Sequence, residues 1–295
     1  MYVRTAFSGS LSVLSLVAFM SLAVELPSDY TVASDLVYGV ADGTELKLDL
    51  YLPKDIVSPP LLVYVHGGAW RGGSKDQNVR AWPFVDDGYA LASVDFRLSG
   101  DAVFPAQIHD IKAAIRFLRA NAIRLGYDAS RIAVLGSSSG AHLAALVGVT
   151  NGHAGLEGKI GDHPEQSSDV QAIVSYYGAS NLTTILGQST PYGLSVREPA
   201  LSLLLGGPLD KKIELARLAS PVFHVDPSDP PLLLLHGDQD PQMPINQSHE
   251  LHHAYKENGL QVRFEVVHGA AHGGDEFNDE KRNAIVKEFL DRQLH

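Results

Sequence analysis

The 295-residue chain contains no cysteine, which excludes disulfide bonds, thiolate metal sites and a lipid-modified N-terminal cysteine. Basic residues are also scarce, because 23 Lys and Arg face 34 Asp and Glu and the net charge is −11. Such an acidic surface argues against nucleic acid and anionic membranes as partners. No repeat of roughly 20 to 50 residues is visible, so a solenoid or propeller is not expected.

Long apolar runs are absent apart from one near the start, from Leu11 to Val24. It follows a single basic residue, Arg4, and is short for a membrane span. With the small residue Ala23 near its end, it predicts a signal peptide over residues 1–23, cleaved near Ala23. The mature chain is then secreted or periplasmic, without stable membrane insertion. An uncleaved anchor and a cytosolic protein with an apolar start remain open alternatives.

The rest of the chain, residues 24–295, has the length and composition of one domain with a large core. Helical spacing of apolar residues predicts a helix from Pro105 to Arg124, and apolar runs predict eight strands. From the third strand on, strands and helices alternate, which predicts an α/β fold with helices on both faces of a mostly parallel sheet and an antiparallel N-terminal edge. The strands are expected near residues 36–40, 46–52, 61–66, 90–96, 132–136, 170–177, 232–236 and 262–267.

Two segments, 150–169 and 178–231, are too long for simple connections. The family resemblance given below implies that insertions at these points lie over the active site, with a small cap insertion at about 178–231.

The sequence Gly136-Ser137-Ser138-Ser139-Gly140 follows the apolar run 132–135 and leads into a helical pattern. A G-x-S-x-G turn between a strand and a helix holds its central residue in a strained, exposed conformation at a helix N-terminus. Ser138 alone has a glycine on each side at two residues' distance. It is therefore the predicted nucleophile.

A serine nucleophile needs donors for the oxyanion that forms on attack. The predicted strand 61–66 leads into the glycine-rich stretch His66-Gly67-Gly68-Ala69-Trp70. Turns of this kind expose backbone N–H groups at the sheet edge. The predicted oxyanion donors are the N–H groups of Gly68, Ala69 and Ser139.

The serine also needs a base and an orienting carboxylate. Asp238 and Asp240 follow the predicted strand 232–236, at the sheet edge where α/β proteins build their sites. His268 and His272 follow the last predicted strand. The chain order serine, aspartate, histidine is that of α/β-hydrolases, but position alone leaves both aspartates and both histidines open.

At these residues the chain resembles bacterial α/β-hydrolase serine esterases of the acetylxylan/feruloyl esterase-like group, near the hormone-sensitive-lipase branch. The resemblance covers about residues 36–290 and implies the α/β-hydrolase fold. It also implies that Asp240 and His272, rather than Asp238 and His268, complete the catalytic triad. Ala69 and Ser139 differ from residues common in the group, where glycine and alanine are frequent, but both keep their backbone N–H.

The resemblance implies a carboxylesterase that forms an acyl-enzyme with short-chain or carbohydrate-linked acyl esters, small molecules or polysaccharides, of the acetyl or feruloyl type. Trp70, Tyr177 and Tyr192 are candidate substrate contacts. No cofactor and no metal are expected, because the histidines at 249, 252 and 253 lack further ligands. Formamide hydrolysis, prolyl-oligopeptidase-like cleavage and a non-catalytic binding module are alternatives.

Overall fold

The computed structural model describes residues 30–77 and 79–295. The predicted signal peptide, residues 1–23, and the first residues of the predicted catalytic domain lie outside these ranges. Among the described helices, none is both long and apolar enough to cross a membrane.

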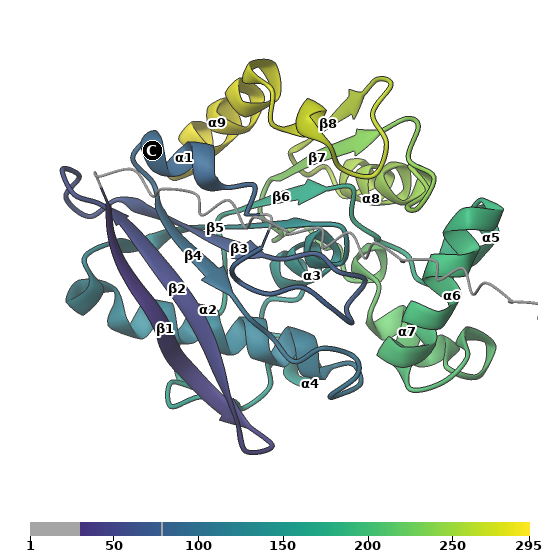
Figure 1. Ribbon diagram of the computed structural model, residues 1–295, viewed down its shortest axis with the longest axis horizontal. Helices are drawn as coiled ribbons and strands as arrows, with labels where there is room; N and C mark the ends of the chain where they lie inside the picture. The colour runs from purple at the N-terminus through teal and green to yellow at the C-terminus, as the bar shows by residue number, and fades with distance from the viewer. Residues whose placement is uncertain (1–29, 78) are drawn as a thin grey trace, which may run out of the picture.

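Eight strands form one mixed sheet in the order β1-β2-β4-β3-β5-β6-β7-β8 (Figure 1). The pairs β1–β2 and β2–β4 are antiparallel, and every later pair is parallel. The strands are β1 Tyr30–Ala41, β2 Thr44–Pro53, β3 Pro60–Val65, β4 Ala90–Val94, β5 Asp128–Ser137, β6 Ala172–Tyr176, β7 Leu232–Gly237 and β8 Val262–Val267. All eight overlap the predicted strands, and β1 and β5 begin earlier than predicted.

Alternation along the strands places apolar side chains on both faces of the sheet. In β3, Leu61, Val63 and Val65 belong to one buried cluster, and Leu62 and Tyr64 belong to the other. A sheet that is apolar on both faces must be covered on both. The first cluster is closed by α2, α3 and α8, and the second by α1 and α9. These helices are α1 Trp82–Asp86, α2 Ala106–Leu125, α3 Ser139–Gly148, α8 Asn246–Glu257 and α9 Glu280–Leu294.

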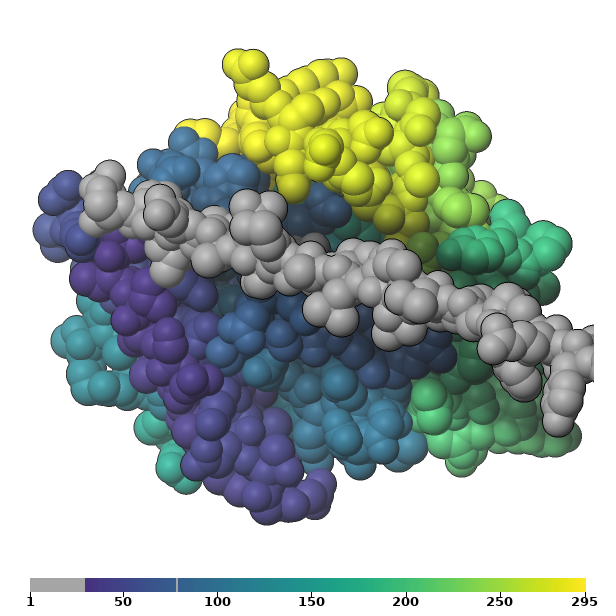
Figure 2. All heavy atoms as spheres, in the orientation of Figure 1, coloured from purple at the N-terminus to yellow at the C-terminus, as the bar shows by residue number. Residues whose placement is uncertain are grey.

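The segment 178–231, between β6 and β7, folds into short helices at one end of the sheet. In Figure 2 it lies in green at the opposite end of the molecule from the purple β1–β2 hairpin. It contains α5 Ile185–Gln188, α6 Pro191–Leu205, α7 Ile213–Leu218 and the 3₁₀ turns Leu209–Lys211 and Pro221–Phe223. One of its residues, Arg197 of α6, lines the cavity above Ser138.

No residue of the segment 150–169 lines the cavity above Ser138, which corrects the expectation that this segment lies over the active site. It contains α4, Ala154–Glu157, and packs against α2. The buried Lys112 of α2 donates to Glu157 at 2.5 Å and to the carbonyl of Thr150 at 2.6 Å. A buried ammonium needs such partners, and this segment supplies them to Lys112 of α2.

Candidate active site

Ser138 occupies the turn between β5 and α3 with φ 55° and ψ −120°, a conformation that L-residues rarely adopt. The turn is possible because its glycines allow close packing. A Cβ on Gly140 would lie 2.1 Å from the carbonyl oxygen of Val65, and one on Gly136 would lie 2.4 Å from Gly140. The turn thereby places Ser138 at the N-terminus of α3. The hydroxyl of its neighbour Ser137 instead lies 3.0 Å from the buried Tyr64 hydroxyl.

Ser138, His272 and Asp240 form one hydrogen-bonded chain. The Ser138 Oγ lies 2.9 Å from Nε2 of His272, and His272 Nδ1 lies 2.6 Å from Oδ2 of Asp240. In the neutral ring, Nδ1–H donates to the carboxylate and Nε2 accepts the serine proton. The arrangement can therefore move a proton from the hydroxyl to the imidazole as the oxygen attacks.

Burial and hydrogen bonds shift the pKa values of His272 and Asp240. Burial lowers the pKa of His272 from 6.5, against the bond and charge of Asp240, which raise it. Burial also acts to raise the pKa of Asp240, but hydrogen bonds from His236 and His272 outweigh it and hold that pKa well below its usual range. The Asp240 side chain has no exposed surface. Near neutral pH the pair is thus an ionised carboxylate and a neutral imidazole.

The other candidates form a separate pair away from the serine. His268 Nδ1 lies 2.8 Å from Oδ2 of Asp238, and the side chain of His268 is 83% exposed. The loops of Asp240 and His272 are joined by a hydrogen bond of 3.0 Å from the Gln239 N–H to the Ala270 carbonyl. Asp240 and His272, the two residues that the family resemblance implied, are the ones joined by hydrogen bonds to Ser138.

The loop after β3 faces Ser138 from the other side. Gly68 and Ala69 line the same cavity as Ser138 and His272, and their φ angles are 123° and 54°. A Cβ on Gly67 would lie 3.4 Å from the Cβ of Ser138, which shows how close the loop comes. Ser139 is the first residue of α3, where backbone N–H groups have no partner within the helix. These positions suit the predicted oxyanion donors.

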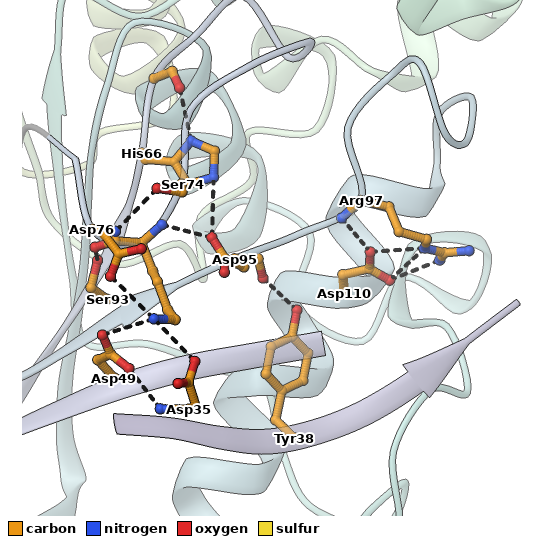
Figure 3. A network of polar contacts seen from close by, with 12 residues as sticks. Asp35, Tyr38, Asp49, His66, Ser74, Asp76, Ser93, Asp95, Arg97 and Asp110 are labelled. Carbon is orange, nitrogen blue, oxygen red and sulfur yellow. Dashed lines mark hydrogen bonds and ion pairs between the residues drawn. The ribbon is translucent and has the colours of Figure 1, made fainter. Parts of the chain in front are cut away.

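A polar network fixes both ends of this loop (Figure 3). At its start, the His66 ring stacks on Phe96 with centroids 4.4 Å apart, and its Nε2 lies 4.0 Å from Asp95. At its end, the Lys75 backbone N–H donates to the same Asp95 carboxylate at 2.6 Å. Burial lowers the pKa of His66, so the ring is neutral. The loop is therefore held to the end of β4 at two points.

The Lys75 side chain carries the network on to the N-terminal strands. Its ammonium contacts Asp49 of β2 at 3.0 Å, Asp35 of β1 at 3.3 Å and Asp76 at 3.1 Å. Lys75 and Asp49 are both buried. Sequence reasoning missed this cluster, because its residues are scattered over three elements and match no motif. Arg97, two residues after Asp95, forms an ion pair with Asp110 at 2.7 Å.

Of the three aromatic candidates, only Tyr177 lines the cavity. Its ring centroid lies 4.8 Å from that of His272. Trp70 is fully buried and donates its indole N–H to Nδ1 of His142 at 3.0 Å, so it is a core residue rather than a substrate contact. Tyr192 is 56% exposed on α6 and does not line the cavity either. An aromatic residue beside a catalytic motif is thus not a reliable sign of a binding contact.

The cavity has a volume of about 440 Å³, and its lining includes two arginines that sequence reasoning did not place there, Arg80 and Arg197. Nothing in the local sequence marks either one, because each comes from a segment without a motif. Within the described ranges, no group of three or more His, Asp or Glu side chains is placed to hold a metal ion.

A known family model matches the part of the chain that carries most of the residues described above. Residues 48–255 match the BD-FAE family model, a span that includes Ser138 and Asp240 but ends before His272. The chain belongs to the BD-FAE family. Its architecture is the α/β-hydrolase fold.

Individual relatives agree with the family. Esterase LipC of Mycobacterium tuberculosis is 31% identical over 81% of this chain and 59% of its own length. A truncated carbohydrate esterase from gut microbiota has a TM-score of 0.83 at 30% identity and covers 91% of this chain and 98% of its own. A bifunctional GH43-CE protein of Bacteroides eggerthii has a TM-score of 0.81 at 34% identity, over 90% of this chain and 35% of its own. This chain spans a little over half of the length of curated relatives such as LipC.

Proposed function

We propose that this protein is a serine carboxylesterase that acts through an acyl-enzyme. The observation that carries the proposal is the chain of contacts from Ser138 Oγ to His272 Nε2, 2.9 Å, and from His272 Nδ1 to Asp240, 2.6 Å. A serine hydroxyl is a weak nucleophile until a neutral imidazole takes its proton. No cofactor enters this mechanism.

In the proposed reaction, Ser138 Oγ attacks the ester carbonyl carbon while its proton moves to His272 Nε2. The N–H groups of Gly68, Ala69 and Ser139 stabilise the oxyanion. His272 then gives the proton to the departing alcohol, and Asp240 stabilises the imidazolium in the interval. Water activated by His272 attacks the acyl-enzyme and releases the acid.

Ester substrates are favoured over amides and over a purely binding role by two observations. Esterase LipC and the carbohydrate esterase from gut microbiota are both named as esterases. The nucleophile, base and carboxylate are all present and mutually bonded, whereas hydrolase-fold binding modules typically lose the serine or the histidine.

For the substrate, we propose short-chain or carbohydrate-linked acyl groups of the acetyl or feruloyl type. The neighbour from gut microbiota is described as a carbohydrate esterase, which supports the carbohydrate-linked class. A cavity of this size suits a small acyl or aromatic group rather than a long lipid chain. We also propose that the protein is secreted or periplasmic after cleavage near Ala23. Cell fractionation with N-terminal sequencing of the purified protein tests this.

A substrate panel tests the activity. It consists of p-nitrophenyl esters from acetate to palmitate, acetylated xylan, methyl ferulate, N-formylkynurenine and a prolyl-naphthylamide. We expect turnover of the short esters, highest below eight acyl carbons. Ser138→Ala should lower kcat by about 10⁶-fold. Ser137→Ala is the matched control, and a larger loss in that variant, or preferred cleavage of an amide, would contradict the proposal.

A further inference from the structure

The cavity above Ser138 is lined by positively charged side chains, although the protein as a whole is acidic. The chain as a whole carries 34 acidic and 23 basic residues. Among the described residues that line the cavity, however, there is no Asp or Glu, and two are arginines, Arg80 and Arg197. The walls of the cavity are therefore positive inside an acidic protein, which favours a negatively charged ligand.

Arg197 carries the argument for a ligand, because its side chain is buried and part of its guanidinium has no hydrogen-bond partner in the described chain. Its exposed fraction is 1%. Its Nε donates to the Gln242 carbonyl at 3.2 Å, but Nη1 is buried without a hydrogen-bond partner among the described residues. No carboxylate of the described chain forms an ion pair with it. A buried cation without a counter-charge is costly, so its persistence in a cavity points to a ligand that supplies the charge.

Asp240, the carboxylate whose charge acts on Arg197, is already engaged by other groups. One of its oxygens accepts from the N–H groups of Gln242 and Met243, each at 2.8 Å. The other lies 2.6 Å from His272 and 3.4 Å from His236. Burial accordingly lowers the pKa of Arg197 from 12.5 to about 10, although the charge of Asp240 acts in the opposite direction.

Arg80 presents a second guanidinium to the same cavity. It lies over the rings of Tyr177 and Phe277, at 5.4 and 5.7 Å from their centroids. Its Nη1 donates to the Gly274 carbonyl at 3.3 Å, and its Nε is buried without a partner in the described chain. These contacts fix the side chain beside the loop of His272.

We propose that the substrate is an ester that also carries a carboxylate, on its acyl or its alcohol part, and that Arg197, supported by Arg80, binds this carboxylate. A planar guanidinium whose Nη1 N–H groups lack a partner in the described chain matches a carboxylate in shape and charge. A half-ester of a dicarboxylic acid or an acylated uronic acid has this chemistry. The inference rests on the proposed esterase activity and narrows its substrate.

Two pairs of esters test it and separate the two positions of the charge. In the acyl pair, mono-p-nitrophenyl glutarate is compared with p-nitrophenyl valerate. In the alcohol pair, 4-acetoxybenzoate is compared with its methyl ester. The measured quantity is the ratio of kcat/KM, anionic to neutral, on the pH plateau, after subtraction of the rate with Ser138→Ala. We expect the ratio to exceed one in one pair and to fall at least tenfold in Arg197→Gln.

Arg197→Lys should restore part of the ratio, because it keeps the charge. Arg217→Gln, a cap arginine that stacks over Phe223 outside the cavity, should leave the ratio as in the wild type. A merely structural role of Arg197 would lower both members of a pair equally and keep the ratio, which would overturn the inference. A wild-type ratio below one in both pairs would overturn it too.

Calorimetric titration of the wild-type protein with glutarate and with 4-hydroxybenzoate measures carboxylate binding in the absence of ester hydrolysis. We expect binding that weakens with added salt and is lost in Arg197→Gln. If no ester is hydrolysed but this binding is found, the esterase proposal fails while the anion site stands. If neutral esters are hydrolysed and neither anion binds, the anion site fails alone.

Discussion

Ser138 shows at the scale of one residue how strain and function coincide. Its φ of 55° is unfavourable for an L-residue, and it is maintained by the packing of Gly136 and Gly140 against their neighbours. The position is recognisable in sequence because glycines are required for steric reasons. The partner residues are less recognisable, because two aspartates and two histidines occupy equivalent loops.

Substitution of the two aspartates separates their roles. Asp240→Asn should lower kcat by about 10⁴-fold, because it removes the group that orients His272 and stabilises its charged form. Asp238→Asn, the matched control, should have a small effect because its partner His268 is exposed. Steady-state kinetics on a short p-nitrophenyl ester measures both. The opposite ranking would assign the catalytic carboxylate to Asp238.

The pH profile of kcat/KM reports His272. Only the neutral ring accepts the proton of Ser138, so activity is lost as pH falls through the pKa of His272. Burial lowers that pKa from 6.5, and the positive charge of Arg197 lowers it further. We therefore expect the acid limb below pH 6.5, and a shift of that limb to higher pH in Arg197→Gln. A limb above 6.5 in the wild type would contradict this assignment.

At the scale of elements, the loop of residues 66–76 depends on charge pairs with β1 and β2 and on a backbone hydrogen bond to Asp95 after β4. Lys75→Met leaves the buried Asp49 without its cation, and we expect the free energy of unfolding to fall by about 3 kcal/mol. The activity should fall as well, because the loop carries the proposed oxyanion donors. Urea denaturation measures the stability. Lys47→Met is the control, since its pair with Glu45 is exposed and should contribute less than about 1 kcal/mol. Equal losses in the two variants would show that the network does not anchor the loop.

The elements themselves were largely predictable because each has a strong local signal. Buried parallel strands such as β7 appear as apolar runs, and α2 has apolar residues at helical spacing. The placement of 150–169 was wrong because a long connection can serve either a site or a neighbouring helix. Its packing on α2 depends on the buried Lys112, a contact between distant residues that no local pattern encodes.

At the scale of the whole molecule, sequence predicts charge but not its distribution. The net charge of −11 predicts an acidic surface, but it does not predict that two arginines line the cavity. Arg80 and Arg197 are 117 positions apart, and only the fold brings them to one site. The same holds for Trp70, whose burial follows from its contact with His142 on α3.

Covalent labelling of the intact protein tests the proposed nucleophile most directly. A fluorophosphonate reacts with an activated serine, and peptide mass spectrometry locates the adduct. We predict a single adduct on Ser138, slowed by a competing short ester, absent in Ser138→Ala and strongly slowed in Asp240→Asn. An adduct on another residue, or none in a preparation that still hydrolyses esters, would contradict the assignment of Ser138.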